Sequence, residues 1–145
     1  MPRVFLDANV WFAGCHSLTG ASALILELAA RRRLHVVTSR VALREAKRNL
    51  SAKSPRRALQ RFHRLLKAIP VEVVRAPDEE ALASYADVIH PHDVPILAAA
   101  LDAQVDYLVT LDRRHFLTPR VRARAGTVTV LTPGDALKDL IGRGR

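Results

Sequence analysis

The sequence has only one cysteine among its 145 residues, Cys15. A single cysteine excludes an internal disulfide and a cysteine-based zinc site, and we expect Cys15 to be an inert free thiol. No apolar run reaches the ~18–20 residues that a membrane-spanning helix needs. The N-terminus leads almost directly into the apolar segment 4–6 and leaves no room for a signal peptide. These absences predict a cytoplasmic protein that does not associate with a membrane.

Acidic residues are also scarce, with 14 Asp and Glu against 23 Lys and Arg and a formal net charge of +9. A basic balance of this size favours polyanionic partners, nucleic acid first, although solubility or an arginine-rich proteome is a simpler explanation. The sequence has no Gly-x-Gly-x-x-Gly or Walker A loop, so a dinucleotide or a nucleoside triphosphate has no motif support. Because acids are few, the places where they occur are informative.

Short apolar strands alternate with helices along the chain. We predict strands over residues 3–6, 34–37, 71–74, 106–110 and 127–131. Helices are predicted over 19–33, 39–50 and 54–70, from 77, over 93–103 and from 132, with Ser39, Ser54 and Thr132 as N-caps. The alternation indicates an α/β fold with a mostly parallel five-stranded sheet covered on both faces. The length indicates one domain over residues 1–145.

Two of the acids, Asp7 and Asp112, follow predicted apolar strands. Parallel sheets hold their ligands in a crevice at the carboxyl ends of the strands, so we expect both acids at the edge of that crevice. Either residue alone is also explained as an aspartate that caps a strand-to-helix turn. Their shared position after two different strands favours a functional role.

Two further acids occur on predicted helices. Glu45 lies on or beside an apolar stripe of its helix, which consists of Val41, Ala42, Ala46 and Leu50. Because a buried, unpaired carboxylate is costly, a salt bridge with a neighbouring Arg or Lys is the competing explanation for Glu45. Asp93 opens an apolar helix with Pro95 in its first turn, and the competing explanation is a helix N-cap worth ~1 kcal/mol. A capping carboxylate can still direct its second oxygen into a site.

The four carboxylates would repel one another strongly if they met at one end of the sheet. A divalent cation would neutralise them, and oxygen ligands from Asp and Glu suit Mg²⁺ or Mn²⁺ rather than zinc. Such a centre can activate a water and stabilise the charge on a phosphate, while a basic surface holds a nucleic-acid backbone. If the acids converge, the sequence predicts a metal-dependent nuclease.

The order of these acids resembles that of a known family. The segment V-F-L-D-A-N-V-W resembles the opening motif of PIN domains, which also have a mid-chain Glu on a helix, an Asp opening a later apolar helix and an Asp after the next strand. Glu45, Asp93 and Asp112 match those positions. The segment H-D-V-P-I-L-A-A-A-L, followed by Y-L-V-T-L-D, is the most specific part, and the similarity extends from Val4 to about Leu117.

The resemblance implies a Rossmann-like three-layer α/β/α fold, dependence on Mg²⁺ or Mn²⁺, and cleavage of single-stranded RNA. It further implies a VapC-like toxin of a bacterial type II toxin–antitoxin pair, with an antitoxin partner and a homodimeric state. Carried over residue by residue, the catalytic metal ligands would be Asp7, Glu45, Asp93 and Asp112, and the polar supports in the same pocket would be Asn9 and Thr110. We expect four basic residues to contact RNA phosphates: His92, Arg113, Arg114 and His115. The alternative is that the basic run after Asp112 pairs with the acids and weakens metal binding.

Two other functions compete with this reading. Phosphotransfer enzymes of the haloacid-dehalogenase type also place an Asp after the first strand, but they need Asp-x-Asp where this chain has Asp7-Ala8-Asn9. The second competitor is a catalytically inactive PIN-like module that binds RNA or protein without cutting. Because such a binder could lose one of its acids, the complete set here favours an active enzyme.

Overall fold

Five short strands form one wholly parallel sheet in the order β3-β2-β1-β4-β5. The computed structural model describes residues 1–143 of the chain. Its strands are β1 (Arg3–Leu6), β2 (His35–Ser39), β3 (Glu72–Val74), β4 (Tyr107–Val109) and β5 (Thr129–Leu131). The central strand β1 pairs with β2 on one side and with β4 on the other, so the carboxyl ends of β1 and β4 are adjacent.

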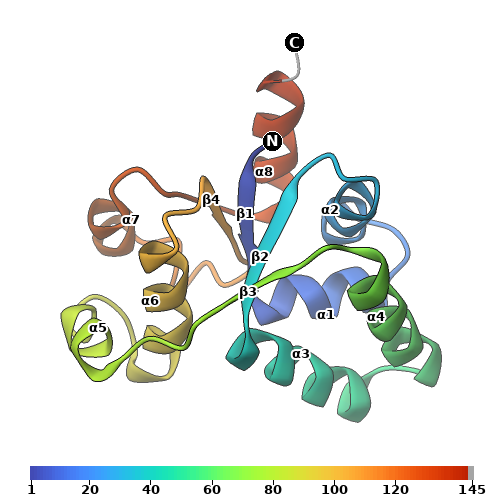
Figure 1. Cartoon of the computed structure of the whole chain (residues 1–145), viewed down its shortest axis with the longest axis horizontal. Helices are drawn as coiled ribbons and strands as arrows, with labels where there is room; N and C mark the ends of the chain where they lie inside the picture. Colours follow the sequence, from blue (N-terminus) through green and yellow to red (C-terminus); the bar gives the residue numbers. More distant parts are fainter. Residues whose placement is uncertain (144–145) are drawn as a thin grey trace.

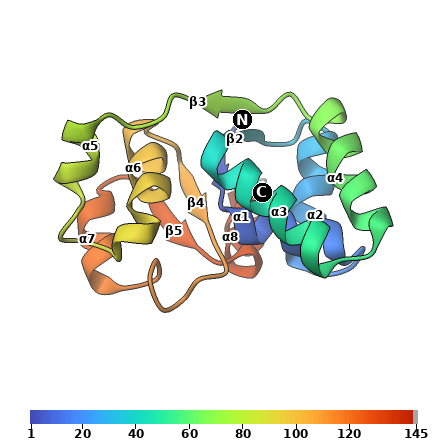
Figure 2. The ribbon, with the colours of Figure 1, turned by 90° about the horizontal axis from the view of Figure 1, so that it is seen from below.

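Helices cover both faces of this sheet (Figures 1 and 2). They are α1 (Ala8–His16), α2 (Ala21–Ala30), α3 (Arg40–Lys53), α4 (Arg56–Ala68), α5 (Glu79–Ser84), α6 (Val94–Asp102), α7 (Pro119–Ala125) and α8 (Pro133–Arg143), with a 3₁₀ turn η1 (Pro91–Asp93) before α6. Both views place α5, α6 and α7 on one side of the sheet and α1 to α4 on the other, and α8 packs against α2. The chain therefore has the predicted three-layer α/β/α architecture.

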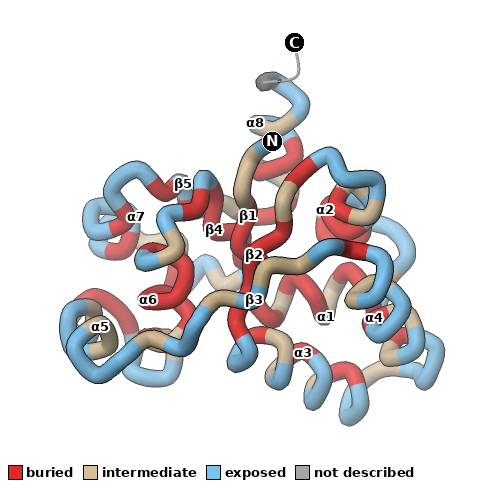
Figure 3. The backbone as a smooth tube through the Cα atoms, in the orientation of Figure 1, coloured by how far each residue is buried: buried red, intermediate tan, exposed pale blue. Residues whose placement is uncertain are grey.

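The core lies on both sides of β1. Val4, Phe5 and Leu6 have no exposed surface, because a central parallel strand is covered by helices on either face. Figure 3 shows the same pattern across the molecule, with buried residues along the inner strands and exposed residues on the outer turns of the helices. Helix α6 is apolar almost all round, and its residues from Ile96 to Leu101 are all buried. This explains why its sequence has almost no polar face.

Two helices were not predicted from the sequence. Helix α1 begins directly after Asp7 and buries Trp11, which lies in the core, and Cys15. Burial raises the pKa of the Cys15 thiol to about 11, in line with an inert thiol. Helix α7 begins at a Thr118 cap whose hydroxyl accepts from the backbone of Val121. Thr118 could be predicted as an N-cap from the sequence, but arginines at every second position obscure the helical spacing of the apolar residues in this short helix.

Several predicted boundaries and contacts were wrong in detail. The helix predicted to reach residue 33 ends at Ala30, because the next turn is closed by backbone bonds with Arg32 in the left-handed region at φ 59°. Ser54 does not cap α4, since Pro55 occupies that position and the Ser54 hydroxyl instead bonds Nδ1 of His16 at 2.6 Å. Val41 is 37% exposed and lies outside the buried stripe of α3. The caps predicted at Ser39 and Thr132 are confirmed.

No single helix within residues 1–143 is long and apolar enough to cross a membrane. The pair α1 and α2, bent by 94° at the break between them, meets the length and composition criteria only when taken together.

Candidate active site

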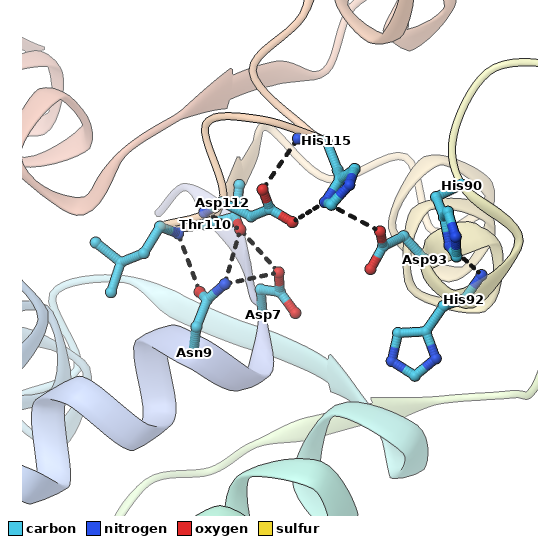
Figure 4. Close-up of polar contacts among 9 residues, drawn as sticks. Asp7, Asn9, His90, His92, Asp93, Thr110, Asp112 and His115 are labelled. Carbon is cyan, nitrogen blue, oxygen red and sulfur yellow. Dashed lines mark hydrogen bonds and ion pairs between the residues drawn. The ribbon is translucent and has the colours of Figure 1, made fainter.

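The ends of β1 and β4 bring Asp7 and Thr110 into contact. Leu6 pairs with Val109 in the sheet, and the residues that follow them lie side by side. The Thr110 hydroxyl donates to Oδ2 of Asp7 at 2.8 Å, while Oδ1 of Asp7 accepts from the backbone N–H of Ala8 at 2.7 Å. Asp7 therefore caps α1 and also takes part in a side-chain network at the carboxyl edge of the sheet (Figure 4).

Asn9 ties this network to the loop that follows β4. Its amide nitrogen lies 3.3 Å from both Oδ2 of Asp7 and the hydroxyl oxygen of Thr110. Its amide oxygen accepts from the backbone N–H of Leu111 at 3.0 Å, and the Thr110 hydroxyl accepts from the backbone N–H of Asp112 at 3.1 Å. The two polar residues proposed as supports thus connect Asp7 with the backbone that carries Asp112.

The side-chain carboxyl of Asp7 has a raised pKa. It is 6% exposed, and its pKa rises from 3.8 to about 6, chiefly because burial disfavours the charged form. The bonds from Thr110 and Ala8 lower this pKa, whereas the negative charges of Glu45 and Asp93 raise it further. Glu45 and Asp93 are therefore within electrostatic range of Asp7, as expected if the acids share one edge of the sheet.

Asp93 and Asp112 meet on either side of His115. Nδ1 of His115 lies 3.0 Å from Oδ2 of Asp112 and 3.7 Å from Oδ2 of Asp93, as Figure 4 shows. One ligand atom from each of these three residues lies within 4.8 Å of the others. Burial and the nearby charge of Asp112 raise the pKa of Asp93, and three histidines lower it in the order His115, His92, His90. Burial and the charge of Asp112 together therefore outweigh the three histidines at Asp93.

Asp93 does not cap the helix that it opens. It stands in the N-cap position of α6, but its carboxylate accepts no hydrogen bond from the backbone of that helix. Its φ of −96° and ψ of −9° are nearly helical, whereas a capping side chain needs an extended backbone to reach forward. The capping explanation is therefore wrong, and the carboxylate is directed toward His115 and Asp112 instead.

Glu45 is half-buried on α3 without a basic partner. In the described part of the chain no Arg, Lys or His forms a salt bridge with it, so the competing explanation of a pair within α3 is wrong. The negative charge of Glu45 raises the pKa of Asp7. Neither of these two acids belongs to the close group of Asp93, Asp112 and His115. The four acids therefore share one edge of the sheet, and two of them converge closely.

Comparison with known proteins identifies the family. The sequence model described as the PIN domain matches residues 3–114. This chain belongs to the PIN domain family. Members of the family are typically nucleases that use a divalent metal. No curated protein matches the sequence at a significant level.

Solved structures share the fold of this PIN domain at low sequence identity. PAE2754 from Pyrobaculum aerophilum is 15% identical, with 97% of this chain and 96% of that chain covered and a TM-score of 0.65. VapBC2 from Rickettsia felis, bound to a DNA fragment from its promoter, is 16% identical over 90% of this chain and 98% of that chain, with a TM-score of 0.61. FitAcB from Neisseria gonorrhoeae is 15% identical over 90% and 97%, with a TM-score of 0.59. At these identities the likeness is one of fold.

The residues of this PIN domain fit a divalent cation. The carboxylates of Asp93 and Asp112 and the imidazole of His115 offer donor atoms close enough to share one ion. The raised pKa values of Asp7 and Asp93 are compatible with this, because a cation would offset both the burial that chiefly raises them and the smaller contribution of the neighbouring acids. The site thus has both the donors and the uncompensated charge that a metal would satisfy.

The basic residues predicted to contact RNA fall in different places. His115 lies between the two acids, as the alternative reading of the basic run suggested. Arg113 and Arg114 are exposed on the same loop, and Arg114 lines a cavity of about 380 Å³ beside His90. His92 is exposed next to Asp93, with its backbone N–H bonded to Nδ1 of His90 at 3.1 Å. Contact with RNA stays a prediction for all four residues.

Sequence reasoning missed one set of residues near the acids. A groove of about 700 Å³ lies beyond the ends of β2 and β3 and reaches Pro95, two residues from Asp93. Three arginines line it: Arg40, Arg44 and Arg75. Within residues 1–143 none of the three forms a salt bridge or a side-chain hydrogen bond. Part of the signal was available, because Arg75 directly follows the predicted strand 71–74, whereas Arg40 follows β2 only with the strand end that the structure shows, at Ser39.

Proposed function

We propose that this PIN domain protein is a metal-dependent ribonuclease that cleaves phosphodiester bonds of single-stranded RNA with a metal-activated water. One observation carries the proposal. In a chain with a net charge of +9, the four acids Asp7, Glu45, Asp93 and Asp112 share one edge of the sheet, and none of them pairs with an Arg or Lys of the described residues. Carboxylates that have no basic partner in a chain rich in Arg and Lys are available to bind a cation.

Each group has a separate task in this mechanism. Asp93 and Asp112 would hold the cation directly, with Glu45 and Asp7 adding negative charge around it. Asn9 and Thr110 keep Asp7 in place and fix the loop that carries Asp112. A bound Mg²⁺ or Mn²⁺ supplies a water of lowered pKa and neutralises charge on the scissile phosphate. The protein residues therefore act by positioning and by charge, as phosphoryl transfer requires.

The arginine groove gives the RNA backbone a path to the acids. Arg40, Arg44 and Arg75 have no acidic partner among the described residues, so their charge is free to meet phosphates. The groove reaches Pro95 at the start of α6, immediately beyond Asp93. Arg113 and Arg114, exposed on the loop after Asp112, would hold the strand on the other side. The choice of RNA over DNA rests on the family resemblance.

We also propose that the protein is the toxin of a bacterial type II toxin–antitoxin pair, acting in the cytoplasm as a homodimer and held inactive by an antitoxin. Support comes from the VapC-like order of the motifs in the sequence and from the shared fold with VapBC2 and FitAcB. Co-expression with the product of the adjacent reading frame should rescue the growth of cells that express this chain. Light scattering that gives a monomer at high concentration would remove the homodimer.

The deciding experiment is cleavage of end-labelled single-stranded RNA with Mg²⁺ or Mn²⁺ and then with EDTA. We compare the wild type with Asp93→Asn and Glu45→Gln, and use Asp87→Asn and Glu80→Gln as matched controls, because Asp87 and Glu80 are exposed acids outside the site. Cleavage should require the metal and be lost in the two site variants only. Full activity of Asp93→Asn would refute the assignment. RNA retained without cleavage by wild type and Asp93→Asn alike would favour the inactive binding module.

A further inference from the structure

His115 is held in place beside the acids by a turn. Its backbone N–H donates to Oδ1 of Asp112 at 3.0 Å, while its ring Nδ1 lies 3.0 Å from Oδ2 of the same carboxylate. One residue thus contacts both oxygens of Asp112, once through the backbone and once through the ring. The ring of His90 lies against it, with the two centroids 5.8 Å apart. These contacts fix Nδ1 on the side of the acids, and Figure 4 shows it pointing into the gap between Asp112 and Asp93.

The position of Nδ1 is one that a metal ligand would occupy. The chosen ligand atoms of Asp93, Asp112 and His115 all lie within 4.8 Å of one another. Ligands of one Mg²⁺ or first-row transition ion, at about 2.0–2.3 Å from the metal, are at most about 4–4.6 Å apart, so only a small adjustment is needed. Among the described residues, no other histidine belongs to this close group.

We propose that Nδ1 of His115 is a ligand of the metal, completing a mixed nitrogen and oxygen site that favours Mn²⁺ over Mg²⁺. The inference rests on the proposed function, since it names a ligand of the same metal. Mg²⁺ takes oxygen donors almost exclusively, whereas imidazole suits transition ions, whose affinities rise from Mn²⁺ along the first row. A site built from acids alone would lack this discrimination.

The competing role for His115 is a hydrogen-bond partner that orients Asp112 without contacting the ion. The two roles differ in what the metal senses. A ligand nitrogen couples magnetically to bound Mn²⁺ and adds selectivity for Mn²⁺. An orienting histidine does neither, and its loss would weaken Mg²⁺ and Mn²⁺ binding by similar factors.

The test is direct metal binding by the full-length protein, without any activity measurement. Electron paramagnetic resonance gives the Mn²⁺ affinity, competition with Mg²⁺ gives the affinity ratio, and pulsed hyperfine spectroscopy detects a coordinated ¹⁴N. The variants are His115→Ala and His115→Gln. The control is His92→Ala, which removes a nearby histidine whose charge also acts on Asp93 but which forms no salt bridge with either carboxylate. Thermal unfolding in EDTA checks that each variant is folded.

We expect a ¹⁴N coupling in the wild type and in His92→Ala that is absent from both His115 variants. The preference for Mn²⁺ over Mg²⁺ should fall by about tenfold or more in His115→Ala. Metal bound at the acids without nitrogen coupling, or an unchanged preference in His115→Ala, would overturn this inference and leave the nuclease proposal standing. Folded wild-type protein that binds neither ion would overturn both.

Discussion

Replacing Asp7 by asparagine should stabilise the metal-free protein at neutral pH. The carboxyl is buried, and its pKa in the folded state is about 6 against an ordinary 3.8. Between these two values the folded protein binds more protons than the unfolded chain, so stability falls as the pH rises through this window. Well above pH 6 the cost is complete, and well below pH 3.8 the residue is neutral in both states and the cost disappears.

The size of the effect follows from the pKa and the hydrogen bonds. A rise in pKa from 3.8 to about 6 corresponds to about 3 kcal/mol of lost stability at pH 7.5. Asparagine keeps an oxygen for the backbone N–H of Ala8, but its NH₂ group would face two donors, the hydroxyl of Thr110 and the amide of Asn9. Losing these two contacts costs about 1–2 kcal/mol. The net gain expected for Asp7→Asn is therefore about 1–2 kcal/mol at pH 7.5.

Urea unfolding in EDTA at several values between pH 4 and 7.5 measures this difference. The advantage of Asp7→Asn over the wild type should shrink toward zero or reverse as the pH falls. Asp87→Asn, at an exposed position, should show no such trend. Added Mn²⁺ should stabilise the wild type more than the variant, because only the wild type retains the full acid set. A pH-independent difference, or a variant less stable at pH 7.5, would refute the argument about Asp7.

Three further substitutions test the support of Asp7, the packing of α1 against α2 and the arginine groove. Thr110→Val removes the hydroxyl that bonds Asp7 and accepts from the backbone of Asp112, so urea unfolding should show a loss of about 1–3 kcal/mol and RNA cleavage should slow. Gly14→Ala would place a Cβ 2.4 Å from Cδ1 of Leu26 and 3.0 Å from the backbone oxygen of Ser22, so we expect the protein to lose about 1–3 kcal/mol of stability. The control Gly134→Ala, whose Cβ would have nothing within 4 Å, should not lower the melting temperature. The triple variant R40E/R44E/R75E should bind RNA more weakly and with a smaller salt dependence in filter binding, while its Mn²⁺ affinity stays unchanged. An unchanged RNA affinity would show that RNA does not bind in the groove.

The carboxyl edge of the sheet was predictable from sequence because each inner strand is an apolar run that stops at a polar residue. Asp7 follows β1, and Thr110 and Asp112 follow β4, so strand order alone brings them together. A parallel sheet covered on both faces leaves few other arrangements for such short apolar segments. The five strands and the three-layer fold were therefore predicted correctly, with boundaries shifted by one or two residues.

The roles of Asp7 and Asp93 as helix caps could not be separated by sequence. Both precede helices, yet Asp7 caps α1 and Asp93 does not cap α6. The difference lies in the preceding turn. The side chain of His90 caps η1, which winds the backbone into a helical conformation one turn early and leaves Asp93 outside the extended region. A capping role for Asp7 was considered as an alternative, but no helix was predicted after it, although α1 begins directly at this cap.

Basic and acidic side chains occupy separate regions around the site, as the proposed function requires. Arginines line the groove beside Pro95, while Asp93 and Asp112 both pair with a single histidine, His115. Without a cation, the acids repel the polyanion that the arginines attract; with a cation, both regions favour the phosphate backbone. If the proposed function holds, metal and RNA must therefore strengthen each other's binding by the same factor. An arginine in the place of His115 would neutralise the acids permanently and abolish that coupling, and this gives a physical reason for a histidine at the centre of a basic loop.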